Sequence, residues 1–162
     1  MTPVEICHLY ISRGHNFTGH HGREPDDYPA IEVSSVECVA GRGIRGDRYF
    51  DFKDDYKGQI TFFSLEVFEE LCRALQVRDC PPSSVRRNVF TRVVDLNELI
   101  GQEFDVQGVR FFGTEESRPC YWMDGAVGAG AQKFLKGRGG LRARILSDGT
   151  LRSTARVPET VG

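Results

Sequence analysis

A cysteine at position 120 stands in the stretch EESRPCYWMD, residues 115–124, where residue types and spacing could support thiol chemistry. Arg118 precedes it by two positions, and two aromatic residues follow it directly. Pro119 biases the preceding residue toward an extended conformation, in which alternate side chains share a face. We therefore predict that Arg118, Cys120 and Trp122 point the same way. A guanidinium close to a thiol favours the thiolate, which is both the nucleophile and the soft metal ligand.

A plain packing role for Cys120, at the end of a strand, stays open beside this interpretation. Glu115 and Glu116 oppose a thiolate unless they point away or pair with an arginine. The chain has five cysteines, widely scattered and without a C-x-x-C pair, which argues against a disulfide framework and a structural zinc site.

The remaining four cysteines are expected to be structural. Cys7, Cys38 and Cys72 fall inside apolar patterns, so we predict buried, inert thiols. Cys80 lies in the loop sequence RDCPPSS and has no evident chemical role.

Arginines recur in two predicted strands and could form an anion site. The stretch 85–92, VRRNVFTR, places Arg86 and Asn88 on one strand face and Arg87 on the other, and an arginine with an asparagine can grip a phosphate or a polar heterocycle edge. The stretch GLRARIL places Arg142 and Arg144 on one face of a strand. Solvated surface charge is the more usual explanation of both patterns, and an anion site stays open beside it.

Three histidines lie within seven residues in the sequence HNFTGHHG. His15, His20 and His21 could bind zinc or iron, although adjacent imidazoles suit a single ion poorly outside a flexible loop. A divalent-metal hydrolase built on them is the weakest alternative. The stretch GIRGDRYF, with Asp47, suits a tight turn and lacks the glycine order of a nucleotide-binding loop.

Short strands must position these residues. Apolar alternation predicts strands over 4–11, 85–92 and 59–63, a bulged strand over 30–41, and hairpins turning at Gln107-Gly108 and Asp148-Gly149. Ser64 is expected to cap the one clear helix, which begins at Leu65. Strands do not alternate regularly with helices, so we predict a mainly β fold, an antiparallel barrel with peripheral helices.

The length and charge indicate one globular domain with no general affinity for polyanions. At 162 residues we expect a single domain over 1–152 and a frayed tail over 153–162. The net charge of −2 predicts neither nucleic-acid nor membrane binding. The first residues read as a strand, with no signal peptide and no bilayer-spanning run, so we expect a cytoplasmic protein.

Taken in order, GIRGDRYF, GQITFF, RRNVFTRVVDLNELIGQEFDVQGVRFFGT, SRPCYWMD and GLRARILSDGTL resemble the MOSC domain over most of residues 31–151. This is the C-terminal domain of molybdenum cofactor sulfurases, and it also occurs as small stand-alone proteins. The resemblance implies a β-barrel of mixed Greek-key type, which agrees with the fold predicted from the pattern of strands.

The resemblance also implies a functional cysteine, which falls on Cys120, as a persulfide carrier or a molybdenum ligand. It implies that Arg118 stabilises the thiolate. The expected binding residues for the molybdenum-pterin cofactor share polar or aromatic side chains in the matching stretches: Arg87, Asn88, Arg142, Arg144, Trp122 and Asp47.

The partners follow from what the chain lacks. It has no aminotransferase-like domain, so no pyridoxal phosphate is expected in this chain, and a cysteine desulfurase would have to deliver sulfur. As a molybdenum enzyme it would need an electron-donating reductase. The alternative is a non-catalytic binding module whose arginine-lined cleft holds a phosphorylated small molecule or a partner, with an unreactive Cys120. The sequence does not define an oligomeric state.

Overall fold

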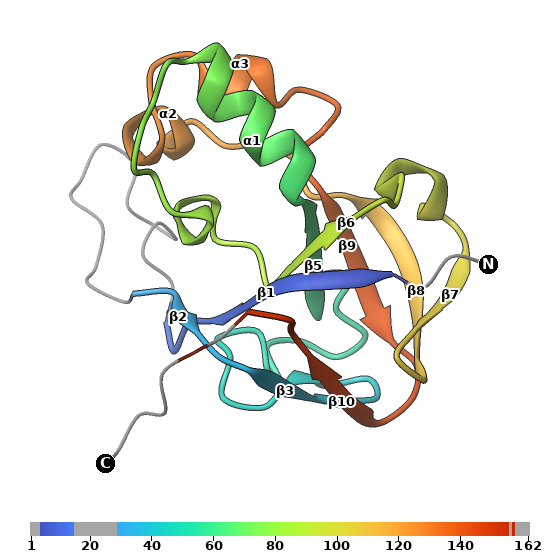
Figure 1. The fold of residues 1–162 in the computed structure, drawn as a ribbon. Coiled ribbons are helices and arrows are strands. Elements are labelled where there is room, and N and C mark those ends of the chain that lie inside the picture. Colours follow the sequence, from blue (N-terminus) through green and yellow to red (C-terminus); the bar gives the residue numbers. More distant parts are fainter. Residues whose placement is uncertain (1–3, 15–28, 156, 158–162) are drawn as a thin grey trace.

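The computed structural model describes residues 4–14, 29–155 and 157, and it shows a mainly β fold (Figure 1). The described strands form a seven-stranded and a three-stranded sheet. This confirms the predicted mainly β class with helices at the periphery. The hydrogen-bonded order of the described strands does not close into one ring, so these strands form two sheets in place of the closed barrel predicted from the sequence.

The seven-stranded sheet has the order β2-β1-β6-β5-β9-β8-β7. Its strands are β1 (Glu5–Ile11), β2 (Ile31–Glu32), β5 (Ile60–Ser64), β6 (Val89–Arg92), β7 (Glu103–Val106), β8 (Val109–Glu116) and β9 (Leu141–Ile145). Strands β5 and β6 are parallel, while the other neighbours are antiparallel. The sheet is therefore mixed, as the resemblance implied.

The three-stranded sheet has the order β10-β3-β4 and is antiparallel. Its strands are β3 (Ser35–Val39), β4 (Gly43–Ile44) and β10 (Gly149–Arg152). This sheet and the three α-helices of the described chain lie at opposite ends of the molecule in Figure 1. The helices are α1 (Leu65–Ala74), α2 (Trp122–Ala126) and α3 (Ala131–Phe134), with two short 3-10 helices at Pro82–Val85 and Leu96–Leu99.

Two apolar clusters make up the core of the described chain. The first joins inward-facing residues of both sheets, including Phe62, Phe111 and Leu151. The second joins the helices to the seven-stranded sheet, and Phe63, Phe90 and others there are fully buried. Burial of this apolar area is the main stabilising term of the fold.

Two local predictions are confirmed in detail. The Ser64 side chain accepts a hydrogen bond from the backbone N of Val67 at 3.2 Å, so it caps α1 as expected. Strands β7 and β8 form a hairpin in which Gln107 and Gly108 both have positive φ, 52° and 84°. Such a two-residue turn matches the twist of the flanking strands.

Two strand predictions are wrong because the chain changes sheet. The stretch 30–41 is not one bulged strand, since β2 pairs with β1 and β3 pairs with β10 and β4. The stretch 141–152 is not a hairpin, since β9 pairs with β5 and β8 while β10 pairs with β3. Local alternation carries no information about which sheet a strand joins.

The end of the chain stays attached to the fold for two residues beyond β10. The Ser153 backbone N donates to the carbonyl of Ser34 at 3.0 Å, and that of Thr154 donates to the carbonyl of Ile6 at 2.9 Å. Residues 156 and 158–162 of the predicted tail lie outside the described residues.

Candidate functional site

Cys120 lies between β8 and α2 and is exposed, whereas each of the other four cysteines is buried or half-buried. All five lie in the described part of the chain. The thiol sulfur is 3.8 Å from the carbonyl oxygen of Arg118. Exposure separates this thiol from the rest, as a working role requires.

The extended conformation predicted through residues 118–122 ends at the cysteine. The carbonyl of Cys120 accepts from the backbone N of Met123 at 3.1 Å, and a turn at Tyr121 begins α2. Trp122 is therefore helical and half-buried against the second apolar cluster. The prediction that it alternates with Arg118 and Cys120 along one strand face is wrong, because the turn rotates it away from that pattern.

Arg87 holds the backbone on which Cys120 is presented. Its side chain is buried and donates to carbonyl oxygens from three parts of the chain: Nε to Gly139 at 3.1 Å, Nη1 to Val85 at 3.0 Å and Nη2 to Ser117 at 3.0 Å. The planar guanidinium carries several fixed donors, which suits this bridging role. We call residues 116–120, which Arg87 fixes, the Cys120 segment.

Two glycines, Gly139 and Gly140, pack closely against the Cys120 segment and, together with Arg87, hold it in place. A Cβ added at Gly139 would lie 2.2 Å from the carbonyl oxygen of Ser117, so only glycine fits there without movement. The Ser117 backbone N donates to the carbonyl of Gly140 at 2.9 Å, and the Gly139 backbone N donates to the Glu116 carboxylate at 3.0 Å. The Cys120 segment is thus packed directly against residues 139–140.

The electrostatics agree with this proximity. Burial lowers the pKa of Arg87 to about 10, and the charge of a Cys120 thiolate counteracts that effect. The thiol therefore lies within electrostatic reach of a buried guanidinium that stays charged at neutral pH. The sequence interpretation assigned this relation to Arg118 instead.

The predicted burial is confirmed for Cys7 and Cys38, whereas Cys72 is half-buried. Burial raises the pKa of Cys7 and Cys72, and it raises the pKa of Cys38 to about 12. These three groups therefore stay protonated near neutral pH, and a protonated thiol is a poor nucleophile.

Asn88 lies beside Arg87 and joins three segments of the fold. Its Oδ1 accepts from the backbone N of Thr61 at 3.0 Å, and its Nδ2 donates to the carbonyl of Tyr10 at 3.1 Å. The strand predicted from residue 85 begins only at Val89, because Val85 ends a 3-10 helix and Arg86 has a positive φ of 55°. The buried side chains of Arg87 and Asn88 therefore contact backbone groups of the protein itself.

Arg142 and Arg144 share the polar face of β9, as predicted, and each pairs with a carboxylate. Arg142 Nη1 lies 3.2 Å from Glu115 Oε1, and Arg144 Nε lies 2.8 Å from Asp55 Oδ1. The pairing of Glu115 removes part of the negative charge that the sequence places near Cys120.

Asp47 is buried and organises the turn after β4. Its carboxylate accepts from the backbone N of Ser12 at 3.0 Å and of Tyr49 at 3.3 Å, and it lies 3.6 Å from Arg48 Nη1. The prediction of a turn here is confirmed. The Tyr49 and Tyr56 rings stack with centroids 5.4 Å apart.

Three residues that interact with Arg87 or with each other were not assigned to the site by the sequence interpretation: Arg48, Tyr49 and Tyr56. Arg48 and Tyr49 both affect the ionisation of Arg87, and burial, followed by the charge of Arg48, lowers the pKa of Arg86 to about 10. Burial raises the pKa of Tyr56, with Tyr49 adding to the effect. The sequence DRYF, residues 47–50, contains Arg48 and Tyr49 and could have indicated their part in the site, but it was interpreted only as a turn.

The histidine hypothesis falls outside the described residues, since His15, His20 and His21 all lie in 15–28. Within residues 4–14, 29–155 and 157, no group of three His, Cys, Asp or Glu residues could hold a metal ion. In the same part of the chain no helix combines the length and apolar character needed to cross a bilayer.

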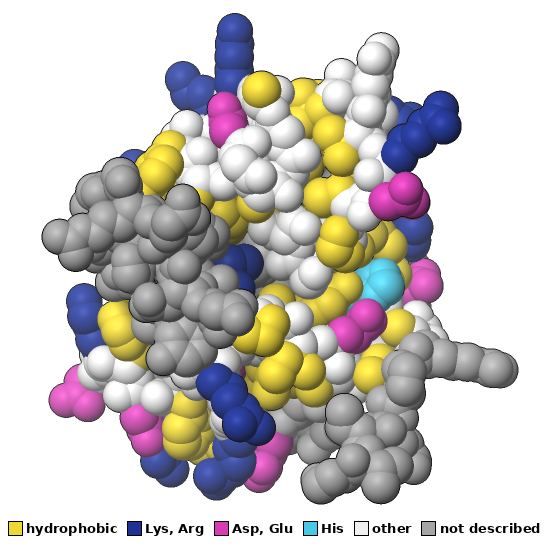
Figure 2. Space-filling view, turned by 90° about the vertical axis from the view of Figure 1, so that its left-hand side faces the viewer, with side chains coloured by type: hydrophobic (Ala, Val, Ile, Leu, Met, Phe, Trp, Pro, Cys, Tyr) yellow, Lys and Arg dark blue, Asp and Glu magenta, His cyan; other side chains and the backbone are white. Residues whose placement is uncertain are grey.

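Charged side chains of both signs are interspersed on the face shown in Figure 2, with basic ones mostly at its rim and hydrophobic ones toward its middle. The described residues of this face form no extended field of one sign, in keeping with the net charge of −2.

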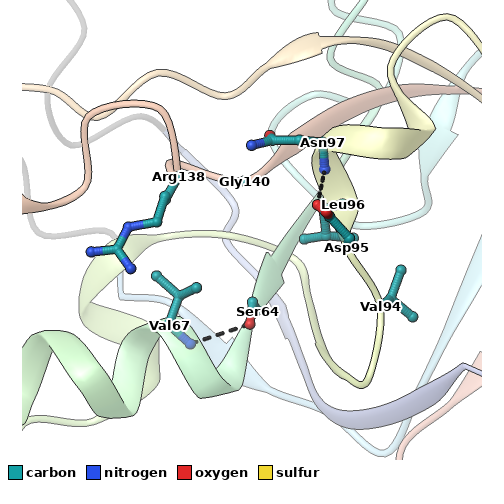
Figure 3. A pocket seen from close by; sticks show the side chains of 8 residues that line it. All are labelled: Ser64, Val67, Val94, Asp95, Leu96, Asn97, Arg138 and Gly140. Carbon is teal, nitrogen blue, oxygen red and sulfur yellow. Dashed lines mark hydrogen bonds between the residues drawn. The ribbon is translucent and has the colours of Figure 1, made fainter.

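Two cavities flank residues 137–140. The larger, of about 500 Å³, is lined by Glu116, Arg118, Pro119, Gln132, Lys133, Lys136 and Gly137. The smaller, of about 250 Å³, lies at the start of α1 (Figure 3). Its polar side chains are engaged within the protein: Ser64 caps α1, the Asp95 carboxylate accepts from the backbone N of Asn97 at 3.1 Å, and Arg138 pairs with Glu70. The larger cavity borders the Cys120 segment.

Comparison with known proteins identifies the fold. The YuaD protein from Bacillus subtilis matches with a TM-score of 0.67 and 16% identity over 93% of this chain and 92% of that one. YiiM from Escherichia coli matches with a TM-score of 0.62 and 14% identity, over 97% of this chain and 71% of that one. YiiM from Geobacillus stearothermophilus matches with a TM-score of 0.66 and 13% identity, over 93% of this chain and 71% of that one. The sequence matches no family model and no curated protein. YuaD and YiiM are MOSC-domain proteins, so the fold of this chain is MOSC-like.

Proposed function

We propose that this chain handles the molybdenum cofactor or its sulfur, with Cys120 as the working thiol. The observation that carries the proposal is the exposed thiol on a clamped backbone: Cys120 is exposed, while buried Arg87 and Gly139 fix the Cys120 segment. A reactive group held on a rigid element loses little freedom when it meets its partner.

The residues present fit the cofactor's chemistry. The Cys120 Sγ would hold the metal, since thiolates suit soft metal ions. Arg118, which is exposed and has no hydrogen bond or ion pair from its side chain to any described residue, would hold an anionic part of the ligand. When bound, the cofactor would supply the redox chemistry of its metal. Trp122 remains a predicted binding residue, as do Arg142, Arg144 and Asp47, but these last three would first have to give up contacts that they make within the protein.

The same thiol can carry sulfur without any metal. The Cys120 thiolate would attack the terminal sulfur of a donor persulfide, forming a new S–S bond at Cys120 while the donor's S–S bond breaks and the donor leaves as a thiolate. This transfer needs no oxidant. A cysteine desulfurase is the partner for this role, and an electron-donating reductase is the partner for the molybdenum role.

An arginine-lined binding cleft without thiol chemistry is less favoured by the contacts. Arg142 and Arg144 are paired with Glu115 and Asp55, and Arg87 donates to backbone carbonyls. A paired or internally bonded guanidinium must give up these contacts to bind a ligand.

Molybdenum and pterin content tests the proposal. Wild type, Cys120→Ser and the matched control Cys80→Ser would be purified from a host that makes the cofactor. We expect near-stoichiometric molybdenum in wild type and in the control, and a loss in Cys120→Ser, if the thiol is a ligand. A persulfide on Cys120 without molybdenum would assign sulfur carriage. The proposal would be contradicted if the wild type contained no molybdenum and Cys120 carried no persulfide.

A further inference from the structure

We infer that the cavity of about 500 Å³ beside the Cys120 segment is a binding site for a dianionic phosphoryl group, free or on a small organic molecule. The volume is in the range of small-molecule sites and exceeds what one phosphate needs. The inference does not depend on the proposed role of Cys120; it shares only Arg118 with the proposed function and adds Lys133 and Lys136.

The charge of the cavity sets it apart from the rest of the molecule. Arg118, Lys133 and Lys136 line it together with one acidic residue, Glu116, so its formal charge is +2 in a chain of net charge −2. The side chains of the three cations have no hydrogen bond or ion pair within residues 4–14, 29–155 and 157, unlike those of Arg142 and Arg144. Unpaired like charges around a hollow repel each other, and an anion relieves that repulsion.

The acidic residue in the cavity is already engaged. Glu116 Oε2 accepts from the backbone N of Gly139 at 3.0 Å, which directs part of its charge toward the protein. The remaining lining residues, Pro119, Gln132 and Gly137, are neutral. The ligand that fits is therefore an anion of charge near −2, which a phosphate monoester carries above its second pKa of about 6.

Side chains, and not backbone amides, must provide the binding. The backbone N atoms of Gly130 and Gln132, at the start of α3, donate to the Asp124 carboxylate at 3.2 and 2.9 Å. These bonds lower the pKa of Asp124, so it stays charged near neutral pH. The start of α3 is thus satisfied, and Arg118 with the two lysines supplies the free donors, which form short charge-assisted bonds to phosphoryl oxygens.

The test is a titration of the full chain with glycerol 3-phosphate, inorganic phosphate and neutral glycerol at pH 8, followed by amide NMR shifts. Lys133→Gln/Lys136→Gln is compared with Arg78→Gln/Arg152→Gln, which removes the same charge from exposed sites outside the cavity. We expect saturable binding of both phosphates, with shifts at Gln132 and Gly137, and affinity weakened about tenfold or more only in the lysine variant. Glycerol should not bind.

Three results would overturn the inference: no saturation by either phosphate, equal weakening in both double variants, or shifts confined to residues away from the cavity. Saturation by glycerol 3-phosphate but not by inorganic phosphate would retain it and assign the organic source. Phosphate binding should persist in Cys120→Ser, and thiol alkylation should persist in the lysine variant, so failure here is distinct from failure of the proposed function.

Discussion

The two sides of the Cys120 segment use arginine in opposite ways. On the inner side Arg87 is buried, and its donors reach carbonyls of Val85, Ser117 and Gly139. On the outer side Arg118 is exposed and its side chain has no described partner. Burial decides the difference, because a buried guanidinium must satisfy its donors within the protein, whereas an exposed one stays available. The inner arginine supports the site, and the outer one is free to bind.

The largest expected effect comes from removing the inner support. Arg87→Met leaves three carbonyl oxygens without their donor, so we expect a loss of about 3 kcal/mol in the free energy of unfolding. Arg87→Lys should lose less, since one ammonium retains the charge but cannot reach three separate segments. Urea unfolding followed by circular dichroism measures both. A loss below about 1 kcal/mol for Arg87→Met would show that the clamp does not hold the segment.

Substitution of glycine residues tests the same support of the Cys120 segment, with a smaller expected change in the free energy of unfolding. Gly139→Ala places a Cβ 2.2 Å from the Ser117 carbonyl, and we expect a loss of about 2 kcal/mol in thermal or urea unfolding. Gly125→Ala is the matched control, because it lies exposed in α2 with open space around it. That substitution should stabilise by up to about 1 kcal/mol. Equal effects at the two positions would contradict the close packing of the Cys120 segment.

The smallest effect on stability is expected on the outer side. Arg118→Gln should change the free energy of unfolding by no more than about 0.5 kcal/mol, because an exposed side chain without partners contributes little. The same variant should weaken glycerol 3-phosphate binding. A large loss of stability in Arg118→Gln would show that this arginine, like Arg87, is a structural residue.

Local features of the fold could be predicted from the sequence. The Ser64 cap and the Gln107-Gly108 hairpin depend on residues a few positions apart, and both are confirmed. Cys120 also stood out from its neighbours alone. The two strand errors, in 30–41 and 141–152, share one cause: the partner sheet is chosen by contacts between distant parts of the chain.

The support of the site could not be predicted, because it is built from distant residues. Arg87 meets Gly139 across 52 positions and Ser117 across 30. The stretch 86–88, Arg-Arg-Asn, therefore suggested side chains that bind a ligand or face solvent. The fold instead buries Arg87 and Asn88. Lys133 and Lys136 likewise line one cavity with Arg118 only through the tertiary fold. A repeating pattern of neighbouring residues carries no information about such long-range contacts.

Competitive alkylation tests the central assignment, a working thiol at Cys120, most directly. Native protein would be treated with limiting iodoacetamide, with and without prior loading of molybdenum cofactor, and all five cysteines followed by peptide mass spectrometry. The account predicts that Cys120 reacts first and that Cys7, Cys38 and Cys72 stay unmodified. If the thiol is a metal ligand, loading should protect Cys120 alone, and full reactivity after loading would leave the sulfur-carrying role. Modification of Cys80 at the same rate as Cys120 would contradict the account.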